Sequence, residues 1–257
     1  MMATAGQPVA ATTAVASETV QFPSDGFTIK AFLARPILPA VPESTPQQSS
    51  GSADGLPAVL VLHEWWGLTD HIKDVTRRFA SEGYGALAPD LYSRQGYKVT
   101  KEPEEASKLM TALATQESLR YLNAAVRVLK SYPFVDPLRV GIVGFSMGGT
   151  LALIMAGHNS DLKACISFYG KVSPPESARY LVSPILYHYP MKDAWVTAQE
   201  VEQLRKGLEQ TGKEGEVAEY PDCQHAFFND TRLAVYRKEA AEKAWRRTLQ
   251  FLANSLR

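Results

Sequence analysis

Short apolar runs alternate along the chain with longer amphipathic segments. The runs have the length of buried strands, and the longer segments repeat apolar residues at helical spacing. Strands are predicted at Ala58–His63, Gly85–Ala88, Val140–Val143, Ala164–Phe168, Pro184–Tyr189 and Glu216–Tyr220, and helices at Asp70–Glu82, about Glu104–Ser131 (long enough to be broken), Ala198–Gln210 and about Arg232–Leu256. This alternation predicts an α/β fold, with a mostly parallel sheet covered by helices on both faces.

The first part of the chain departs from this alternation. Val20–Ala34 alternates around Ser24-Asp25-Gly26, which predicts an antiparallel hairpin at a sheet edge. Residues 36–57 are rich in Pro, Ser and Gly and are expected to form a flexible surface loop. Residues 1–17 lack the charged and apolar parts of a secretory signal, so we expect a disordered N-terminal arm and a cytoplasmic protein. Residues 18–257 are then expected to form a single domain.

Charge and cysteine content narrow the function. Lys and Arg number 27, as do Asp and Glu, and no basic stripe stands out, so neither nucleic acid nor a membrane surface is an expected partner. No apolar run approaches the roughly 20 residues of a membrane span. The two cysteines, Cys165 and Cys223, are too few for a disulfide framework, and Cys165 is expected to be buried in its strand.

The segment VGIVGFSMGGTLALIMA carries the strongest chemical signal. Within it, Gly144-Phe145-Ser146-Met147-Gly148 has the G-x-S-x-G pattern of a nucleophile elbow, between a predicted strand and an apolar helix that opens at Met147. The glycines fit a turn too tight for side chains, and the helix N-terminus favours developing negative charge. Ser146 is therefore the predicted nucleophile. The alternative is a Gly-rich turn in an ordinary α/β protein.

A serine hydroxyl needs a base to take its proton and an acid to orient that base, and proteins with this elbow order them Ser, Asp or Glu, then His. Of five histidines, only His188 and His225 lie beyond the elbow near the carboxyl end of a predicted strand. His188 falls inside an apolar strand and is expected in the core, so His225 is the predicted base. Asp193 follows the preceding strand and is the predicted acid, and Asp222, three residues before His225, competes with it.

Further candidates follow the ends of other predicted strands, where function gathers in a parallel sheet. The N–H groups of Trp65 and Met147 are expected to form an oxyanion hole. Aromatic residues also lie on these loops: Trp65, Trp66, Tyr92, Tyr169 and Trp195. They predict an aromatic-walled pocket suited to a flat, conjugated or aryl substrate, although aromatic residues at strand ends also cap cores.

With these pieces in place, the chain resembles the dienelactone hydrolase (carboxymethylenebutenolidase) family. The resemblance runs from about Gln21 to the C-terminus and rests on VLHEWWGL, YGALAPDLYSRQG, VGIVGFSMGGTLAL and PILYHYPMKDAWV, with DCQHAFF as a looser match. Glu64 directly before Trp65 and the string PDLYSRQG are more specific to this family than the elbow is. The resemblance implies an α/β-hydrolase fold without a large cap domain.

The resemblance also implies roles for individual residues. Ser146, Asp193 and His225 match the catalytic triad, and Trp65 and Met147 match the oxyanion donors.

Three further positions match residues around the family's substrate. Glu64 matches a buried glutamate that pairs with the resting nucleophile and moves away when substrate binds. Arg94 matches an arginine that holds a substrate carboxylate, which suits its fork of donors, and Tyr169 matches an aromatic residue of the pocket wall.

Two departures from the family pattern affect the chemistry. The best-studied members use Cys where this chain has Ser146, and because serine has a much higher pKa than cysteine, His225 is expected to be the direct base while Glu64 shapes the pocket. Members specific for dienelactone also have a second carboxylate-binding arginine where this chain has Asn229. That loss weakens the case for an anionic lactone, unless Arg232 takes its place.

The expected function is therefore a serine esterase that cleaves a small ester or lactone through an acyl-enzyme on Ser146. The mechanism needs no metal or organic cofactor, and none is expected. His63-Glu64 lacks the second histidine of H-E-x-x-H, so a zinc site is not expected either. A monomer or small homo-oligomer is expected. A thioesterase or peptidase on the same fold, and a catalytically silent binding relative, remain the alternatives.

Overall fold

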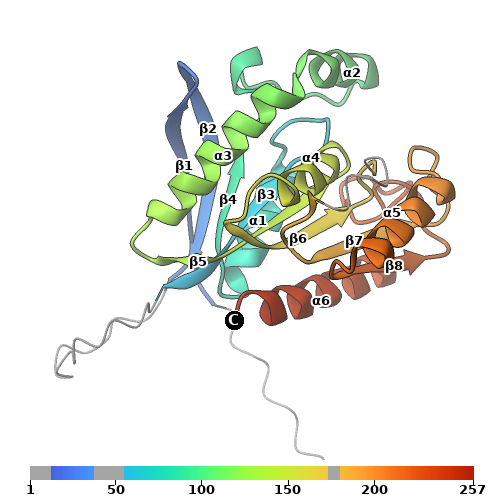
Figure 1. Cartoon of the computed structure of the whole chain (residues 1–257). Helices are drawn as coiled ribbons and strands as arrows, with labels where there is room; N and C mark the ends of the chain where they lie inside the picture. Colours follow the sequence, from blue (N-terminus) through green and yellow to red (C-terminus); the bar gives the residue numbers. More distant parts are fainter. Residues whose placement is uncertain (1–12, 38–54, 173–179) are drawn as a thin grey trace, which may run out of the picture.

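The fold is built on one eight-stranded sheet (Figure 1). A computed structural model describes residues 13–37, 55–172 and 180–257 of the chain. The strand order is β1-β2-β4-β3-β5-β6-β7-β8. The strands are β1 (Val15–Ser24), β2 (Phe27–Pro36), β3 (Leu56–Leu62), β4 (Gly85–Pro89), β5 (Val135–Phe145), β6 (Leu162–Phe168), β7 (Ile185–Pro190) and β8 (Gly215–Tyr220). Strands β1 and β2 form an antiparallel hairpin, and β2 pairs with β4 in antiparallel orientation. Strands β3 to β8 are all parallel to one another, so the predicted mostly parallel sheet is confirmed.

Helices cover both faces of the sheet, because alternate side chains of the buried strands point to opposite sides. On β3, Leu60 and Leu62 join the apolar cluster under α3, α4 and α5, and Val59 and Val61 join the cluster under α1 and α6. The helices are α1 (Asp70–Ser81), α2 (Pro103–Ala112), α3 (Thr115–Ser131), α4 (Met147–Ala156), α5 (Ala198–Thr211) and α6 (Lys238–Ser255), with a short 3-10 turn η1 (Ser93–Gln95). In the view of Figure 1, α2 lies above α4.

Most of the predicted elements are found, with differences at their ends. The long helical stretch is indeed broken, into α2 and α3, at Leu113-Ala114. The last helix begins at Lys238, six residues later than predicted, because the chain from Ala226 to Arg237 first turns back on itself. In that turn, the Arg237 N–H donates to the Phe227 carbonyl and the Asn229 N–H donates to the Ala226 carbonyl.

The N-terminal expectations are only partly met by the described residues. The edge hairpin is confirmed, but β1 begins at Val15, so the expected arm of residues 1–17 overlaps a strand whose register with β2 starts at Val15 and Pro36. The rest of that arm, and residues 38–54 of the expected loop 36–57, lie outside the described residues. None of the described helices is long and apolar enough to cross a membrane.

The parallel strands bring the candidate residues to one edge of the sheet. Trp65 follows β3, Ser146 follows β5, Asp193 follows β7 and His225 follows β8. Since β3 to β8 all point the same way, these four loops meet at the carboxyl ends of the strands, where side chains from distant parts of the sequence can act together.

Candidate active site

Ser146 lies at the tip of a strained turn between β5 and α4. Its φ of 53° and ψ of −115° lie outside the ordinary regions for a residue with a side chain. The turn is held because the Ser146 N–H donates to the Phe168 carbonyl at 2.9 Å. Glycine is required on both sides: a Cβ on Gly144 would overlap the Gly148 carbonyl, and a Cβ on Gly148 would lie 2.6 Å from the His63 carbonyl oxygen. The predicted elbow is therefore present in the backbone itself.

The side chains of Ser146, His225 and Asp193 form one continuous chain of hydrogen bonds. The Ser146 Oγ lies 2.8 Å from His225 Nε2, and His225 Nδ1 lies 2.8 Å from Asp193 Oδ2. The Asp193 side chain is fully buried, and its Oδ1 accepts the N–H groups of Trp195 and Val196 at 2.7 and 3.1 Å. The aspartate is thus fixed on both oxygens and orients the imidazole that faces the serine hydroxyl.

The two competing residues lie elsewhere. His188 is buried, with Nδ1 2.8 Å from the Tyr220 hydroxyl and Nε2 3.0 Å from Thr248 Oγ1, and burial lowers its pKa to about 3. Asp222 is exposed and pairs with Lys192 at 2.8 Å, so it does not brace His225. His188 is therefore the core histidine that its apolar strand predicts.

Trp65 and Met147, the residues expected to supply the oxyanion donors, line the same cavity as Ser146. Met147 is the first residue of α4, so its N–H has no partner within the helix. The Trp65 N–H belongs to the peptide that carries the Glu64 carbonyl, and that carbonyl lies 2.6 Å from His63 Nδ1. Because a trans peptide is planar, fixing the carbonyl oxygen also fixes the N–H, which points the opposite way. His63 therefore sets the direction of the Trp65 donor.

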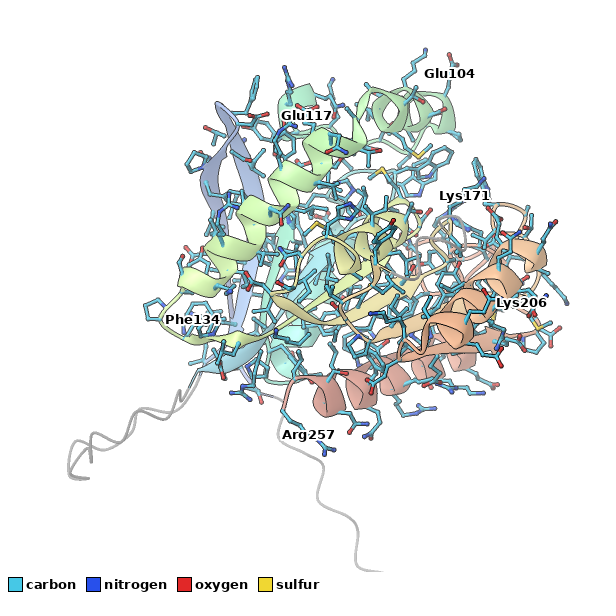
Figure 2. All side chains as sticks on the ribbon, in the orientation of Figure 1. Glu104, Glu117, Phe134, Lys171, Lys206 and Arg257 are labelled. Atoms are coloured by element: carbon cyan, nitrogen blue, oxygen red, sulfur yellow. The ribbon has the colours of Figure 1, made fainter. Side chains whose placement is uncertain are left out.

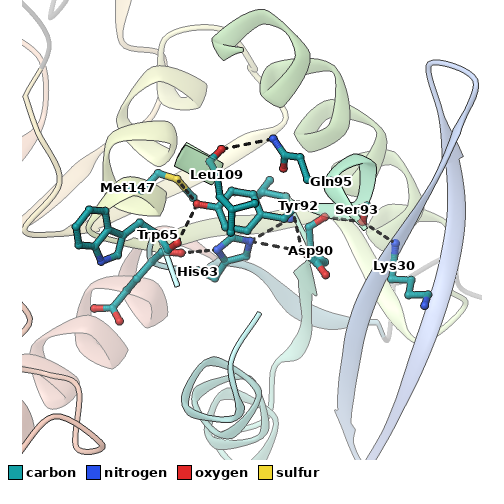
Figure 3. A network of polar contacts seen from close by, with 11 residues as sticks. Lys30, His63, Trp65, Asp90, Tyr92, Ser93, Gln95, Leu109 and Met147 are labelled. Carbon is teal, nitrogen blue, oxygen red and sulfur yellow. Dashed lines mark hydrogen bonds and ion pairs between the residues drawn. The ribbon is translucent and has the colours of Figure 1, made fainter. Parts of the chain in front are cut away.

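A buried polar network behind Trp65 holds His63 in turn (Figure 3). His63 Nε2 accepts the Leu91 N–H at 3.0 Å, which leaves Nδ1 as the donor to Glu64, and burial lowers the His63 pKa to about 4. The imidazole is thus neutral and acts as a fixed hydrogen-bonding strut. This role was not predicted, although a histidine at the end of a buried strand, directly before Glu64, is a signal for it in the sequence.

Tyr92 also belongs to this network and is not part of the pocket wall, which corrects the prediction. Its side chain is fully buried, and its hydroxyl donates to the Trp65 carbonyl at 2.9 Å and lies 3.5 Å from the Met147 sulfur. The Tyr92 N–H donates to Asp90 Oδ1 at 2.9 Å. Tyr92 therefore supports the loop that carries Trp65 from behind, a contact between residues 27 positions apart.

Glu64 is buried as expected, but its hydrogen-bond partners in this structure are not the nucleophile. Its Oε2 accepts from Asn229 Nδ2 at 2.7 Å, and its Oε1 lies 3.4 Å from the Tyr169 hydroxyl. Asn229 is oriented for this contact, because its Oδ1 accepts both the N–H and the hydroxyl of Thr231. The Asn229 amide, at the position where the resemblance places an arginine in members specific for dienelactone, thus serves as a neutral partner for Glu64. The two residues are 165 positions apart, and the sequence did not reveal the pairing.

A cavity of about 690 Å³ opens onto Ser146 and His225. Four of the five predicted aromatic residues line it: Trp65, Trp66, Tyr169 and Trp195. Among the described residues, Lys171 and Arg232 are the charged ones that line it, and the Arg232 guanidinium lies 5.2 Å from the centre of the Trp66 ring. Among the described residues, no group of three or more His, Cys, Asp or Glu side chains is placed to hold a metal ion.

Arg94 does not line this cavity, which corrects the prediction that it holds a substrate carboxylate. Its guanidinium pairs with Glu117 on α3 and lies 4.3 Å from the centre of the Phe27 ring on β2. Figure 2 shows Glu117 and the cavity residue Lys171 well apart. Arg94 therefore ties η1 to α3 and the edge hairpin. The loop that carries Arg94 follows the end of β4, as predicted. The η1 turn, however, directs the Arg94 side chain toward the β1–β2 hairpin and away from the cavity.

An elbow serine, a histidine and a buried aspartate at the carboxyl edge of a mostly parallel sheet define an α/β-hydrolase. Residues 45–256 match the model of the dienelactone hydrolase family, and the chain belongs to that family.

Individual relatives agree with this assignment. A protein of Methylorubrum extorquens, provisionally named a carboxymethylenebutenolidase, is 32% identical over 95% of this chain and 86% of its own length. "Protein usf" of Aquifex pyrophilus is 36% identical over 79% of this chain and 90% of its own length. A crystal structure from Klebsiella pneumoniae, provisionally titled a dienelactone hydrolase, superposes with a TM-score of 0.82 at 31% identity, covering 93% of this chain and 99% of that one.

The network behind Trp65 predicts a specific dependence of stability on pH. Burial raises the pKa of Asp90 from 3.8 to about 6, although the Tyr92 N–H opposes the shift. The folded protein therefore binds the Asp90 proton more tightly than the unfolded chain does. This contribution to stability is complete below pH 3.8 and is lost as the pH rises through about 6.

Asp90→Asn removes this titration and keeps an oxygen for the Tyr92 N–H. The difference in unfolding free energy, variant minus unsubstituted protein, should rise by about 2–3 kcal/mol from pH 4 to pH 7.5, because only the unsubstituted protein loses the Asp90 contribution over this range. Urea unfolding of both proteins at several pH values measures this difference. His63, whose pKa is also shifted by burial, is present in both proteins, so its effect on stability cancels in the difference. A difference that stays constant across this range would contradict the role assigned to Asp90.

Proposed function

We propose that this protein is a serine hydrolase that cleaves carboxylic esters or lactones through an acyl-enzyme on Ser146. The observation that carries the proposal is the continuous arrangement of Ser146 Oγ, His225 and Asp193, with 2.8 Å at each of its two contacts. A binding protein has no need of a nucleophile, a base and an orienting acid in this order.

Each step of the reaction has a group in place. His225 Nε2 takes the hydroxyl proton as Ser146 Oγ attacks the carbonyl carbon, and the N–H groups of Trp65 and Met147 receive the negative charge on the carbonyl oxygen. Each donor contributes about 3–4 kcal/mol to the stabilisation of that charge. The imidazolium then gives its proton to the leaving alcohol, and water releases the acid by the same route in reverse.

The family supports the substrate class. The name carboxymethylenebutenolidase, given provisionally to several relatives, denotes hydrolysis of a butenolide. A butenolide is a lactone, which is a cyclic ester, and the same attack on a carbonyl opens it. Glu64 takes no proton from Ser146 in this scheme. Its hydrogen bonds to Asn229 and Tyr169 hold it away from the hydroxyl, and it contacts the cavity only through Tyr169, which lines it.

Of the two candidate arginines, Arg232 is the one available to an anionic substrate, and Arg94 is not. Arg232 lines the cavity beside Trp66, next to the proposed oxyanion donor Trp65, whereas the partner of Arg94 is Glu117. We therefore assign any contact with a substrate carboxylate to Arg232, whose planar fork of donors suits that group.

Covalent labelling and ester turnover test the triad. A fluorophosphonate should label Ser146, and Ser146→Ala should abolish both the label and the hydrolysis of p-nitrophenyl acetate. Asp193→Asn should lower kcat by about 10⁴-fold because the imidazole loses its orienting carboxylate. Asp222→Asn, which changes an exposed acid close to the same histidine in sequence, is the matched control and should keep full activity. Equal losses in the two Asp variants, or a labelled residue other than Ser146, would refute the proposal.

Two arginine variants test the assignment of the cation. Arg232→Gln should lower kcat/KM for an anionic lactone by about tenfold or more, the value of a hydrogen bond to a charged group, and leave p-nitrophenyl acetate within about twofold. Arg94→Gln should leave kcat/KM for both substrates within about twofold, because its partner lies outside the cavity. Steady-state kinetics with both substrates decide the point, and a loss confined to Arg94→Gln would reverse the assignment.

A further inference from the structure

We propose that the part of the cavity between α4 and the α2–α3 pair binds the acyl group of the substrate, and that esters with a medium-length apolar acyl chain are preferred over acetate-sized ones. The inference rests on the proposed function, because it takes Ser146 as the point of attack. We call this part of the cavity the acyl arm and define it by Met110, Leu113, Leu151, Ile154 and Ser118.

The size of the cavity exceeds what a small lactone requires. Its volume of about 690 Å³ falls in the range of pockets that enclose drug-sized ligands, roughly 300–1,000 Å³. A five-membered lactone would leave most of that space to water. Apolar walls in contact with water are costly, so a substrate that covers them gains binding energy.

The acyl arm begins at the nucleophile and extends along one face of α4. Met147, Leu151 and Ile154 line the cavity and follow one another at spacings of four and three residues, so they share one face of the helix. At about 1.5 Å per residue, Ile154 lies about 10 Å farther along the helix than Met147. This length suits a chain of several methylene groups attached to the carbonyl carbon.

The arm is mostly apolar. The cavity residues on its helices that carry hydroxyl groups are Ser118, Thr115 and Thr150, and the Thr150 hydroxyl donates to the Ser146 carbonyl at 3.5 Å. Met110 and Leu113 from α2 and its C-terminal end face the cavity opposite the α4 side chains. The Ser118 hydroxyl donates to the Ala114 carbonyl at 3.0 Å, so its proton is already used. The charged cavity residues, Lys171 and Arg232, belong to other segments, after β6 and after His225. The arm therefore favours hydrocarbon over a polar or charged group.

The topology assigns the arm to the acyl side of the ester. The leaving oxygen must take its proton from His225 Nε2, so the alcohol lies toward the loop that follows β8. The α2–α3 pair belongs to the opposite side of the elbow, because α3 packs on β1, β3, β4 and β5, whereas β8 is the other edge of the sheet. Of the two halves of the ester, the acyl chain is the one that extends away from His225 and enters the arm.

A series of p-nitrophenyl esters from acetate to octanoate tests the inference on the unaltered protein. Each methylene that enters the arm should raise kcat/KM about two- to fourfold, so that octanoate exceeds acetate by at least about fiftyfold. Lengthening the alcohol of acetate esters should give no comparable gain. Equal rates for acetate and octanoate, or a gain found only on the alcohol side, would overturn the inference.

A pair of tryptophan variants locates the effect. Met110→Trp fills the arm and should lower the ratio of kcat/KM for octanoate to kcat/KM for acetate at least about tenfold. Lys108→Trp is the matched control, because two residues along the same helix place the new ring about 200° away, on the exposed face. An unchanged ratio of octanoate to acetate in Met110→Trp would also overturn the inference.

The same assay separates the two proposals. If the unaltered protein and Ser146→Ala hydrolyse acetate equally, the proposed function fails, whatever the chain-length series shows. If acetate turnover depends on Ser146 but does not rise with acyl length, the acyl arm fails and the proposed function stands.

Discussion

The candidate active site, at the carboxyl ends of the parallel strands, depends on a close approach of two backbone segments where α4 begins. Gly148 lies so near the Leu62 and His63 carbonyls that any side chain there would collide with them, and Gly144 is equally confined by Gly148. This contact sets the N-terminus of α4 against the end of β3. It forces Ser146 into its strained conformation and brings the Met147 N–H to the loop that carries the Trp65 N–H. The nucleophile and both proposed oxyanion donors therefore depend on one packing constraint.

Three of the supports around this site, His63, Tyr92 and Asn229, are neutral and buried. His63 fixes the Glu64–Trp65 peptide from below, and Tyr92 fixes the next peptide through its carbonyl. Asn229 holds Glu64 with an amide rather than a cation. Such groups keep their hydrogen bonds over a wide pH range and do not compete with the charges that develop on the substrate and on His225. We infer that the donors are preorganised, which is how a hydrogen-bonded site stabilises charge without reorganisation during the reaction.

The sequence predicted those parts of the fold and site that follow from local patterns. Hydrophobic periodicity located the strands, and G-x-S-x-G located the turn at Ser146 because only glycine permits that backbone geometry. Prediction from the sequence failed where the contact that decides a residue's role joins distant segments of the chain. Arg94 pairs with Glu117 and Tyr92 supports Trp65 from behind, and both facts depend on how η1 turns after β4. The Glu64–Asn229 contact likewise needs the loop after His225 to fold back over the sheet.

The most direct test of the account is to look for the covalent intermediate. Rapid mixing of the protein with p-nitrophenyl acetate, followed by an acid quench during the first turnovers and peptide mass spectrometry, should find one acetyl group per chain on the peptide that contains Ser146. His225→Ala should accumulate this adduct far more slowly, because the hydroxyl then lacks its base. Turnover without any acetyl group on Ser146, and with undiminished rate in Ser146→Ala, would contradict the account.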